Sequence, residues 1–352
     1  MAILKERSIL PGFRWSFAAT VVWLGLLVLL PLSTLVVNSL TIGFEETPYH
    51  VVSDGKLTGE IVYLHDRDLD DKAVAPAGSD LSGESVNAII YGEVEEIPVE
   101  ELELVAPTRG ERFWAGVWRG VPQFIEKAFN ERVLASLRVT FSTAFFAAIL
   151  NLFLGGIIAY ALVRIKIPGK KVLDSLIDLP FAMPTAICGI AMVTMYAPNG
   201  PVGALAAKAG IKIAFTPLGI TLALLFIGLP FVVRALQPAL LDLGTELEDA
   251  AMSLGASRFT AWRRVIVPTI APALLTGFTL AFARGLGEYG TVIFIAGNTP
   301  MKTEITSLLI VTQLEQFDYA GATAIALTML TASLALIFGI NKFFTNRHKS
   351  LK

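Results

Sequence analysis

The 352-residue sequence has few charged residues, a single cysteine and only three histidines. Charged residues make up 16% of the chain, whereas a soluble globular protein carries about 25%. The one cysteine, Cys188, lies in an apolar run, which excludes an intrachain disulfide framework and a thiolate metal site. The composition therefore argues against a soluble protein and against a disulfide-stabilised one.

Motifs for catalysis and for cofactors are missing as well. The sequence contains no G-x-x-x-x-G-K-[ST] pattern, so we expect no ATP site of that type in this chain. His50, His65 and His348 are dispersed and predict no metal site. No candidate nucleophile has a base beside it in a recognisable motif. We therefore expect neither an enzyme nor a cofactor-binding protein, and no nucleic acid as a partner.

The sequence is rich in long apolar runs. Hydrophobic residues make up 54% of it. Six runs contain no Asp, Glu, Lys or Arg: 15–44, 139–163, 179–207, 213–233, 265–283 and 319–341. A membrane helix needs about 20 such residues, so the predicted fold class is an all-α integral membrane protein with six transmembrane helices. The first run is too long, and lacks the small-residue cleavage pattern, for a signal peptide, so we expect a retained span.

The positions of lysine and arginine predict the orientation, because cytoplasmic loops carry an excess of both. Basic residues gather before the first run, in alternate loops and after the last run: Lys5, Arg7 and Arg14; Arg164, Lys166, Lys170 and Lys171; Arg258, Arg263 and Arg264; Lys342, Arg347, Lys349 and Lys352. Both termini are therefore expected in the cytoplasm. The predicted organisation is an N-terminus with helix 1 (1–42), an external insert (43–112), a transmembrane domain (132–341) and a basic cytoplasmic tail (342–352).

The insert between the first two runs is acidic. Residues 41–110 hold 16 acidic and four basic residues. The segments 60–65 and 88–94 read as short strands with glycine and proline between them. We expect a small β-rich or partly disordered external module, either a docking surface for a binding protein or a solvated appendage. Phe113, Trp114 and Trp118 follow it and are typical of an interfacial aromatic belt.

One polar stretch between two apolar runs, 245–268, has the pattern of a folded loop. Thr245 and Glu248 are spaced as a capping box at a helix start, and Leu247, Ala250, Ala251 and Leu254 make one apolar stripe. Gly255 is expected to end this helix in a left-handed conformation, and Ser257 to cap a second one. The pattern predicts two short helices broken at a glycine, suited to docking in a partner's cleft.

This stretch also resembles the signature loop of ABC-transporter permeases, which has an acidic residue and two alanines, then a glycine, then an apolar pair before proline. The matching residues are Asp249, Ala250, Ala251, Gly255, Val265, Val267 and Pro268, with Glu248 one position early. The resemblance implies that the loop, with its flanks at 242–268, couples the permease to an ATPase subunit.

Further runs resemble the sulfate/thiosulfate permease subunits of bacterial ABC importers. They lie at 10–13, 178–185, 230–234 with 237–238, 285–298, 303–307 and 316–319. The resemblance implies a type I importer permease fold in the bacterial cytoplasmic (inner) membrane. It implies as partners a second permease, two ATP-binding cassette subunits that bind the ATP, a periplasmic sulfate/thiosulfate-binding protein and membrane lipid. The long acidic insert departs from the family, whose first external loop is usually short.

Three ionisable residues in or beside the apolar runs are candidates for the translocation path or its gating. Arg284 and Glu288 are four residues apart and can pair on one helix face, among Gly285, Gly287 and Gly290. Charges inside membranes generally face the bundle interior and mark pathways. The pair is either a structural ion pair beside the path or a direct gate. Arg234 is either a third path residue or an interfacial arginine that reaches toward water.

Two other functions remain open from the sequence. A molybdate or tungstate permease shares parts of the same motifs, and the sequence does not separate sulfate from thiosulfate. An ion-coupled secondary transporter could use Arg284 and Glu288 as a relay, but it would have no need of the 245–268 loop. A purely structural membrane scaffold would have no use for charges inside a span. Pro180, Pro184 and Pro230 are expected to kink or break their helices.

Overall fold

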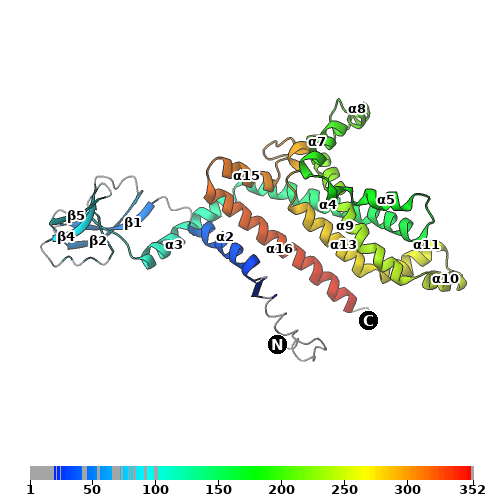
Figure 1. Cartoon of the computed structure of the whole chain (residues 1–352), viewed down its shortest axis with the longest axis horizontal. Helices are drawn as coiled ribbons and strands as arrows, with labels where there is room; N and C mark the ends of the chain where they lie inside the picture. Colours follow the sequence, from blue (N-terminus) through cyan, green and yellow to red (C-terminus); the bar gives the residue numbers. More distant parts are fainter. Residues whose placement is uncertain are drawn as a thin grey trace. The chain divides into compact units, whose positions relative to one another are not determined.

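The computed structural model divides into two compact units. One unit comprises 1–128 and 318–327, and the other comprises 129–317 and 328–352 (Figure 1). The residues that the structure describes are 20, 22–23, 25–41, 46–53, 56–65, 72, 74–77, 79, 81, 85–90, 93–98 and 102–349. Of the sequence predictions, the run LPGF at 10–13 and the basic residues Lys5, Arg7, Arg14 and Lys352 lie outside them.

The first unit contains helices and a six-stranded sheet. A π-helical turn, η1 (Gly25–Leu29), leads into α2 (Leu30–Thr41), which falls within the first predicted span. The strands are β1 (Glu46–Ser53), β2 (Lys56–His65), β3 (Val74–Ala75), β4 (Ser85–Ile90), β5 (Glu93–Pro98) and β6 (Leu104–Val105). Helix α3 (Arg109–Ala128) follows and crosses the predicted insert boundary at 112.

The strand order in the sheet is β2-β1-β6-β3-β4-β5, and only the β6–β3 pair is parallel. Tyr49, Val74 and Leu104 form its small buried cluster. The expected β-rich insert is confirmed. The expectation of one strand over 88–94 is wrong, because β4 ends at Ile90 and β5 begins at Glu93, antiparallel to it.

The second unit is built around three helices: α4 (Glu131–Arg164), α9 (Pro217–Leu243) and α13 (Ala271–Leu286). They pack against one another (Figure 1), with small side chains such as Ala144, Ala148 and Ala223 fully buried between them. A Cβ added at Gly155 would stand 2.9 Å from the side chain of Val232, so this glycine lets α4 and α9 approach closely. Small residues at such contacts are typical of membrane bundles.

The third predicted span is broken into pieces. It contains α6 (Leu179–Ala182), α7 (Thr185–Tyr196) and α8 (Pro201–Lys208), after α5 (Lys170–Ile177). The breaks come at Met183-Pro184 and before Pro201, because proline disfavours a helical residue before it. The prediction that Pro184 breaks its helix is confirmed, whereas α9 continues through Pro230.

The fifth predicted span is bent. A π-helical turn, η4 (Trp262–Ile266), and α12 (Val267–Thr269) precede α13, and the chain turns by 69° between α12 and α13. Pro268 thus lies two residues before the bend at Ile270. The remaining helices are α10 (Glu246–Ser253), α11 (Arg258–Ala261), α14 (Val292–Ala296), α15 (Thr306–Glu315) and α16 (Tyr319–Lys349).

All six predicted runs contain helix, but not all as single spans. Over the described part of the chain, α4, α9 and the first 24 residues of α16 are long and apolar enough to cross a membrane, and the bent pair would be a fourth span. Two shorter apolar helices, Gly25–Val36 and Thr185–Tyr196, occupy the other two runs.

Candidate functional site

The polar loop at 242–268 folds as two short helices broken at a glycine. Gly255 has φ +86°, and its N–H donates to the carbonyl of Met252 while the Ala256 N–H donates to that of Ala251. These two bonds form a Schellman motif, which ends α10. Ser257 then caps α11 by accepting from the N–H of Thr260. The predicted helix–glycine–helix geometry is therefore present.

The predicted capping box at Thr245 is wrong. The Thr245 side chain accepts no capping bond, and Glu248 points elsewhere. Its Oε1 accepts from Nε of Arg164, the last residue of α4, at 3.1 Å, and the Tyr160 hydroxyl lies 3.5 Å from its Oε2. Arg164 also donates to the carbonyl of Gly244. A charge-assisted bond to arginine is stronger than one to a neutral amide, so Glu248 joins α10 to α4.

The outer side of this loop is apolar and exposed. Leu254 is 89% exposed, and Leu247, Met252, Phe259 and Trp262 are exposed too. The rings of Phe259 and Trp262 stack with their centroids 6.2 Å apart. Asp249 and Ala250 are exposed and Ala251 is half-buried. The predicted stripe therefore stays uncovered by this chain's described residues, as a surface that docks into a partner would be.

Arg284 and Glu288 are paired as predicted. Arg284 Nη1 lies 2.5 Å from Glu288 Oε2. Helix α13 ends at Leu286, so Glu288 lies beyond it, where its Oε1 accepts from the N–H of Thr291 at 2.9 Å. Glu288 is buried, while Arg284 is half-buried. The buried carboxylate is thus held by one charge and one backbone donor.

The segment after Glu288 packs closely on the start of α7. The Thr291 hydroxyl donates to the carbonyl of Thr185 at 3.0 Å. A Cβ added at Gly290 would stand 2.2 Å from the Thr185 hydroxyl oxygen, so only glycine fits there. Cys188, on the same helix, is buried. The ion pair therefore sits beside a tightly packed break between helices.

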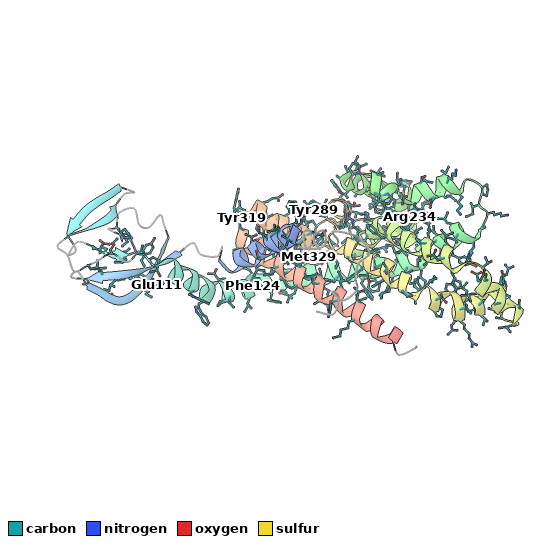
Figure 2. All side chains as sticks on the ribbon, turned by 60° about the horizontal axis from the view of Figure 1, so that its bottom comes forward. Glu111, Phe124, Arg234, Tyr289, Tyr319 and Met329 are labelled. Carbon is teal, nitrogen blue, oxygen red and sulfur yellow. The ribbon has the colours of Figure 1, made fainter. Side chains whose placement is uncertain are left out.

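Arg234 lies in a polar cluster that joins α9 to α5. It donates to Asp178 Oδ1 at 2.9 Å and also to Oδ2, to Asp174 Oδ1 at 2.8 Å, and to Gln237 Oε1 at 2.6 Å (Figure 2 labels Arg234). Gln237 donates to Asp174 in turn, and bonds from Gln237 and then Arg234 hold the pKa of Asp174 below its usual value. These partners do not include the Arg284–Glu288 pair, so the structure brings Arg234 together with Asp174 and Asp178 instead.

Asp174 and a second polar cluster were not expected. Glu304 is buried, and its two carboxylate oxygens accept hydrogen bonds from Nε and Nη2 of Arg132, at 2.8 and 2.6 Å. Beside it, the Thr306 N–H donates to the Thr140 hydroxyl at 2.9 Å. The family-like run at 303–307 already contained Glu304 and Thr306, but nothing in the sequence pointed to Arg132. This cluster holds the loop before α15 on the first turns of α4.

No cluster of metal ligands is found among the described residues. No three His, Cys, Asp or Glu side chains among them come together as metal ligands. His50, one of the dispersed histidines, has its Nε2 3.6 Å from a carboxylate oxygen of Glu111. Four acidic residues near the candidate sites are instead paired with arginines: Glu248, Glu288, Asp174 and Asp178.

Comparison with known proteins adds three findings. Residues 151–349 match the family described as the inner membrane component of binding-protein-dependent transport systems. The sulfate transport system permease protein CysT of Salmonella typhimurium is 46% identical over 228 residues, which are 65% of this chain and 80% of that protein. The probable sulfate transport system permease protein of Chlorokybus atmophyticus is 50% identical over 218 residues, 62% of this chain and 76% of that protein.

The fold has a counterpart among solved structures. A chain of a bacterial ABC transporter involved in the import of the acidic polysaccharide alginate aligns with a TM-score of 0.53 and 15% identity, over 63% of this chain and 82% of that one. A second structure of such a transporter, in complex with a periplasmic protein carrying an alginate pentasaccharide, gives a TM-score of 0.51 at 16% identity, over 64% and 86%. At this identity the likeness concerns the fold.

Proposed function

Because this chain belongs to the family of inner membrane components of binding-protein-dependent transport systems, we propose that it is the permease subunit of an ATP-driven importer of sulfate or thiosulfate. The substrate is supported by relatives at 46% and 50% identity that are named as sulfate permeases. The observation that carries the ATP-driven mechanism is the exposed apolar surface of the 245–268 loop, held in shape by the Schellman motif at Gly255.

The chain would work within a larger complex. Its proposed partners are a second permease subunit, two ATP-binding cassette subunits and a periplasmic binding protein. ATP would be bound and hydrolysed by the cassette subunits, since this sequence has no phosphate-binding loop motif. In this arrangement both termini and the 245–268 loop face the cytoplasm, which the basic loops support.

Movement of the loop would reach the membrane helices through Arg164. This arginine binds Glu248 of α10 and the carbonyl of Gly244 at the end of α9. It thereby joins the coupling loop to the last turn of α4, which packs against α9 and α13. Closure of the two ATPase subunits would shift α10, and this joint would carry the shift into the helices that open the cavity to either side.

Arg284 and Glu288 would serve the anion path. A lone buried carboxylate would repel sulfate, and Arg284 neutralises it at 2.5 Å. Arg284 is half-buried, so part of its guanidinium remains available to water or to a passing anion. Arg234, with its two aspartates, is better explained as a clamp between α5 and α9.

The substrate and the energy source are tested together in the host cell. After deletion of the gene for this chain, we expect radiolabelled sulfate uptake to fall and molybdate uptake to stay unchanged. In the wild type, arsenate, which depletes ATP, should stop uptake, whereas an uncoupler at constant ATP should not. Loss of molybdate uptake alone would assign the chain to molybdate or tungstate. Inhibition by the uncoupler alone would favour the ion-coupled alternative, against which the family membership argues.

A further inference from the structure

Helix α3 (Arg109–Ala128) is amphipathic and too charged to cross a membrane. Its 20 residues include six charged ones: Arg109, Glu111, Arg112, Arg119, Glu126 and Lys127. It is not among the helices of the described chain that have the length and composition of a span. A capping box starts it: the Thr108 N–H donates to Glu111 Oε2 at 2.9 Å, and the Glu111 N–H donates to the Thr108 hydroxyl at 3.2 Å.

One side of α3 is fixed against its own unit. Gly120 and Ala128 are buried and Phe124 is half-buried, and α3 packs on α2. Near its end, Lys127 Nζ donates to Asp318 Oδ1 at 2.6 Å, just before α16 begins. Figure 2 labels Glu111 at the end of α3 nearest the sheet and Phe124 further along the same helix.

The neighbouring side of α3 is apolar and exposed. Trp114 is 59% exposed and Trp118 is 77% exposed, and Val121 and Ile125 are exposed as well. These four follow a spacing of four, three and four residues, which places them in one stripe along a helix. Gln123 and Glu126, which fall on the polar arc of the same helix, are exposed too. We define the stripe of Trp114, Trp118, Val121 and Ile125 as the α3 stripe.

We infer that α3 lies in the plane of the external membrane–water interface with the α3 stripe in lipid. Two residues separate Ala128 from Glu131, where the 34-residue apolar helix α4 begins, so the end of α3 is within about 10 Å of a membrane-spanning segment. Tryptophan prefers the headgroup level. A helix with tryptophan on one face and charges on the other binds at that depth without crossing.

The position of α3 has a consequence for the acidic sheet. His50 of β1 is 3.6 Å from Glu111 in the first turn of α3, and the Ala106 N–H donates to the carbonyl of Ala75. The sheet is thus attached to the helix through β1, and the Ala106–Ala75 bond continues the β6–β3 pair within the same unit. An interfacial α3 would hold this acidic module close to the outer membrane surface.

The depth of α3 is measured with nitroxide labels on the assembled transporter in liposomes. In a Cys188→Ala background, labels at Trp118→Cys and Ile125→Cys are compared with labels at Gln123→Cys and Glu126→Cys on the same helix. We expect the first two to collide more with oxygen, which dissolves in lipid, and the last two more with a water-soluble nickel chelate. Equal access of the chelate to all four labels would overturn the inference and place the α3 stripe in water. Protection of labels 118 and 125 from both reagents would also overturn it and indicate that protein covers the stripe.

The placement of α3 on the external side of the membrane rests on the proposed function, whereas its depth in the interface does not. An impermeant maleimide should label Ser53→Cys in intact spheroplasts and should label Ser175→Cys, on α5, only after the cells are opened. Both serines are exposed. The reverse pattern would contradict the external side and the proposed topology with it, while the depth measurement would still decide whether α3 lies in the interface.

Discussion

Two arginine–glutamate pairs of this permease differ in how far apart their members lie in the chain. Arg284 and Glu288 are four residues apart, and the Glu288 side chain is 2% exposed. Arg164 and Glu248 are 84 residues apart, and the Glu248 side chain is 16% exposed. The first pair neutralises a charge inside the bundle, whereas the second joins two elements. In the proposed mechanism, the same chemistry would therefore serve the anion path in one place and coupling in the other.

The largest effect is expected for the buried pair. Removing one partner of a buried ion pair costs about 3 kcal/mol or more, which is roughly a hundredfold in an equilibrium. Arg284→Gln should therefore nearly abolish sulfate uptake, because it leaves Glu288 with only the Thr291 N–H as a donor. Glu288→Gln should be less severe, since half-buried Arg284 can still reach water.

The double variant Arg284→Gln/Glu288→Gln sharpens this prediction. It removes both charges, so uptake at matched membrane abundance should recover in part over the Arg284→Gln single variant. Additive losses without recovery would mean that each charge acts by itself, as in a relay. The reading of the pair as mutual neutralisation would then be wrong.

An intermediate effect is expected for the joint at Arg164. A hydrogen bond to a charged group contributes about 1.5 kcal/mol or more, or roughly tenfold. In Arg164→Ala and Glu248→Ala, we expect less sulfate transported per ATP hydrolysed, with the complex still assembled. The reversed pair Arg164→Glu/Glu248→Arg should restore part of the ratio. Exposed Glu246, two residues earlier in α10, provides the control. An equal loss of sulfate transported per ATP in Glu246→Ala would contradict the role of the Arg164–Glu248 pair.

The smallest effect is expected for a carboxylate that water reaches freely. Glu111 is 52% exposed, and its pKa is lowered first by the Thr108 N–H, then by the Thr108 hydroxyl and His50. A lowered folded-state pKa means that the ionised Glu111 carboxylate stabilises the folded state. This contribution to stability is present above the pKa of the unfolded chain and is lost as the pH falls through the folded-state pKa. Exposure and salt keep it small.

Hydrogen exchange across the start of α3 measures this effect. Protection of the Thr108 amide, corrected for intrinsic exchange, should decrease modestly as the pH falls below the usual carboxylate range. Glu111→Gln retains a capping side chain and should remove the pH dependence. If the decrease persists in Glu111→Gln, another group is responsible for it.

The sequence predicted those features that depend on local pattern. The left-handed glycine at 255, the cap at Ser257 and the pairing of Arg284 with Glu288 each follow from spacings of a few residues. The capping box was missed at Thr108–Glu111 and wrongly placed at Thr245–Glu248. Both have the same S/T-x-x-E spacing, and only the fold brings Arg164 to the second glutamate.

The contacts between distant segments were beyond the sequence. Arg234 with Asp174, and Arg132 with Glu304, join residues 60 and 172 positions apart. The broken third span shows a similar limit. An absence of charge over 179–207 indicates membrane, but only the prolines at 184 and 201 indicate where the helix ends, and α9 continues through Pro230.

The proposed coupling of this permease to ATP hydrolysis through 245–268 is tested by comparing two glycines. Gly210 ends α8 with φ +75° and the same two Schellman bonds as Gly255, and a Cβ at either position meets nothing within 4 Å. A side chain at either glycine therefore adds the same backbone strain, about 1–2 kcal/mol. Gly255→Asn should be milder than Gly255→Leu, because asparagine tolerates this conformation.

The deciding measurement is sulfate uptake together with ATP hydrolysis by the Gly255→Leu and Gly210→Leu complexes in liposomes. We predict that Gly255→Leu assembles but loses uptake and substrate-stimulated hydrolysis, because α11 is re-aimed, while Gly210→Leu keeps most of both. Normal coupled uptake in Gly255→Leu, or an equal loss in the two variants, would contradict the assignment of the loop.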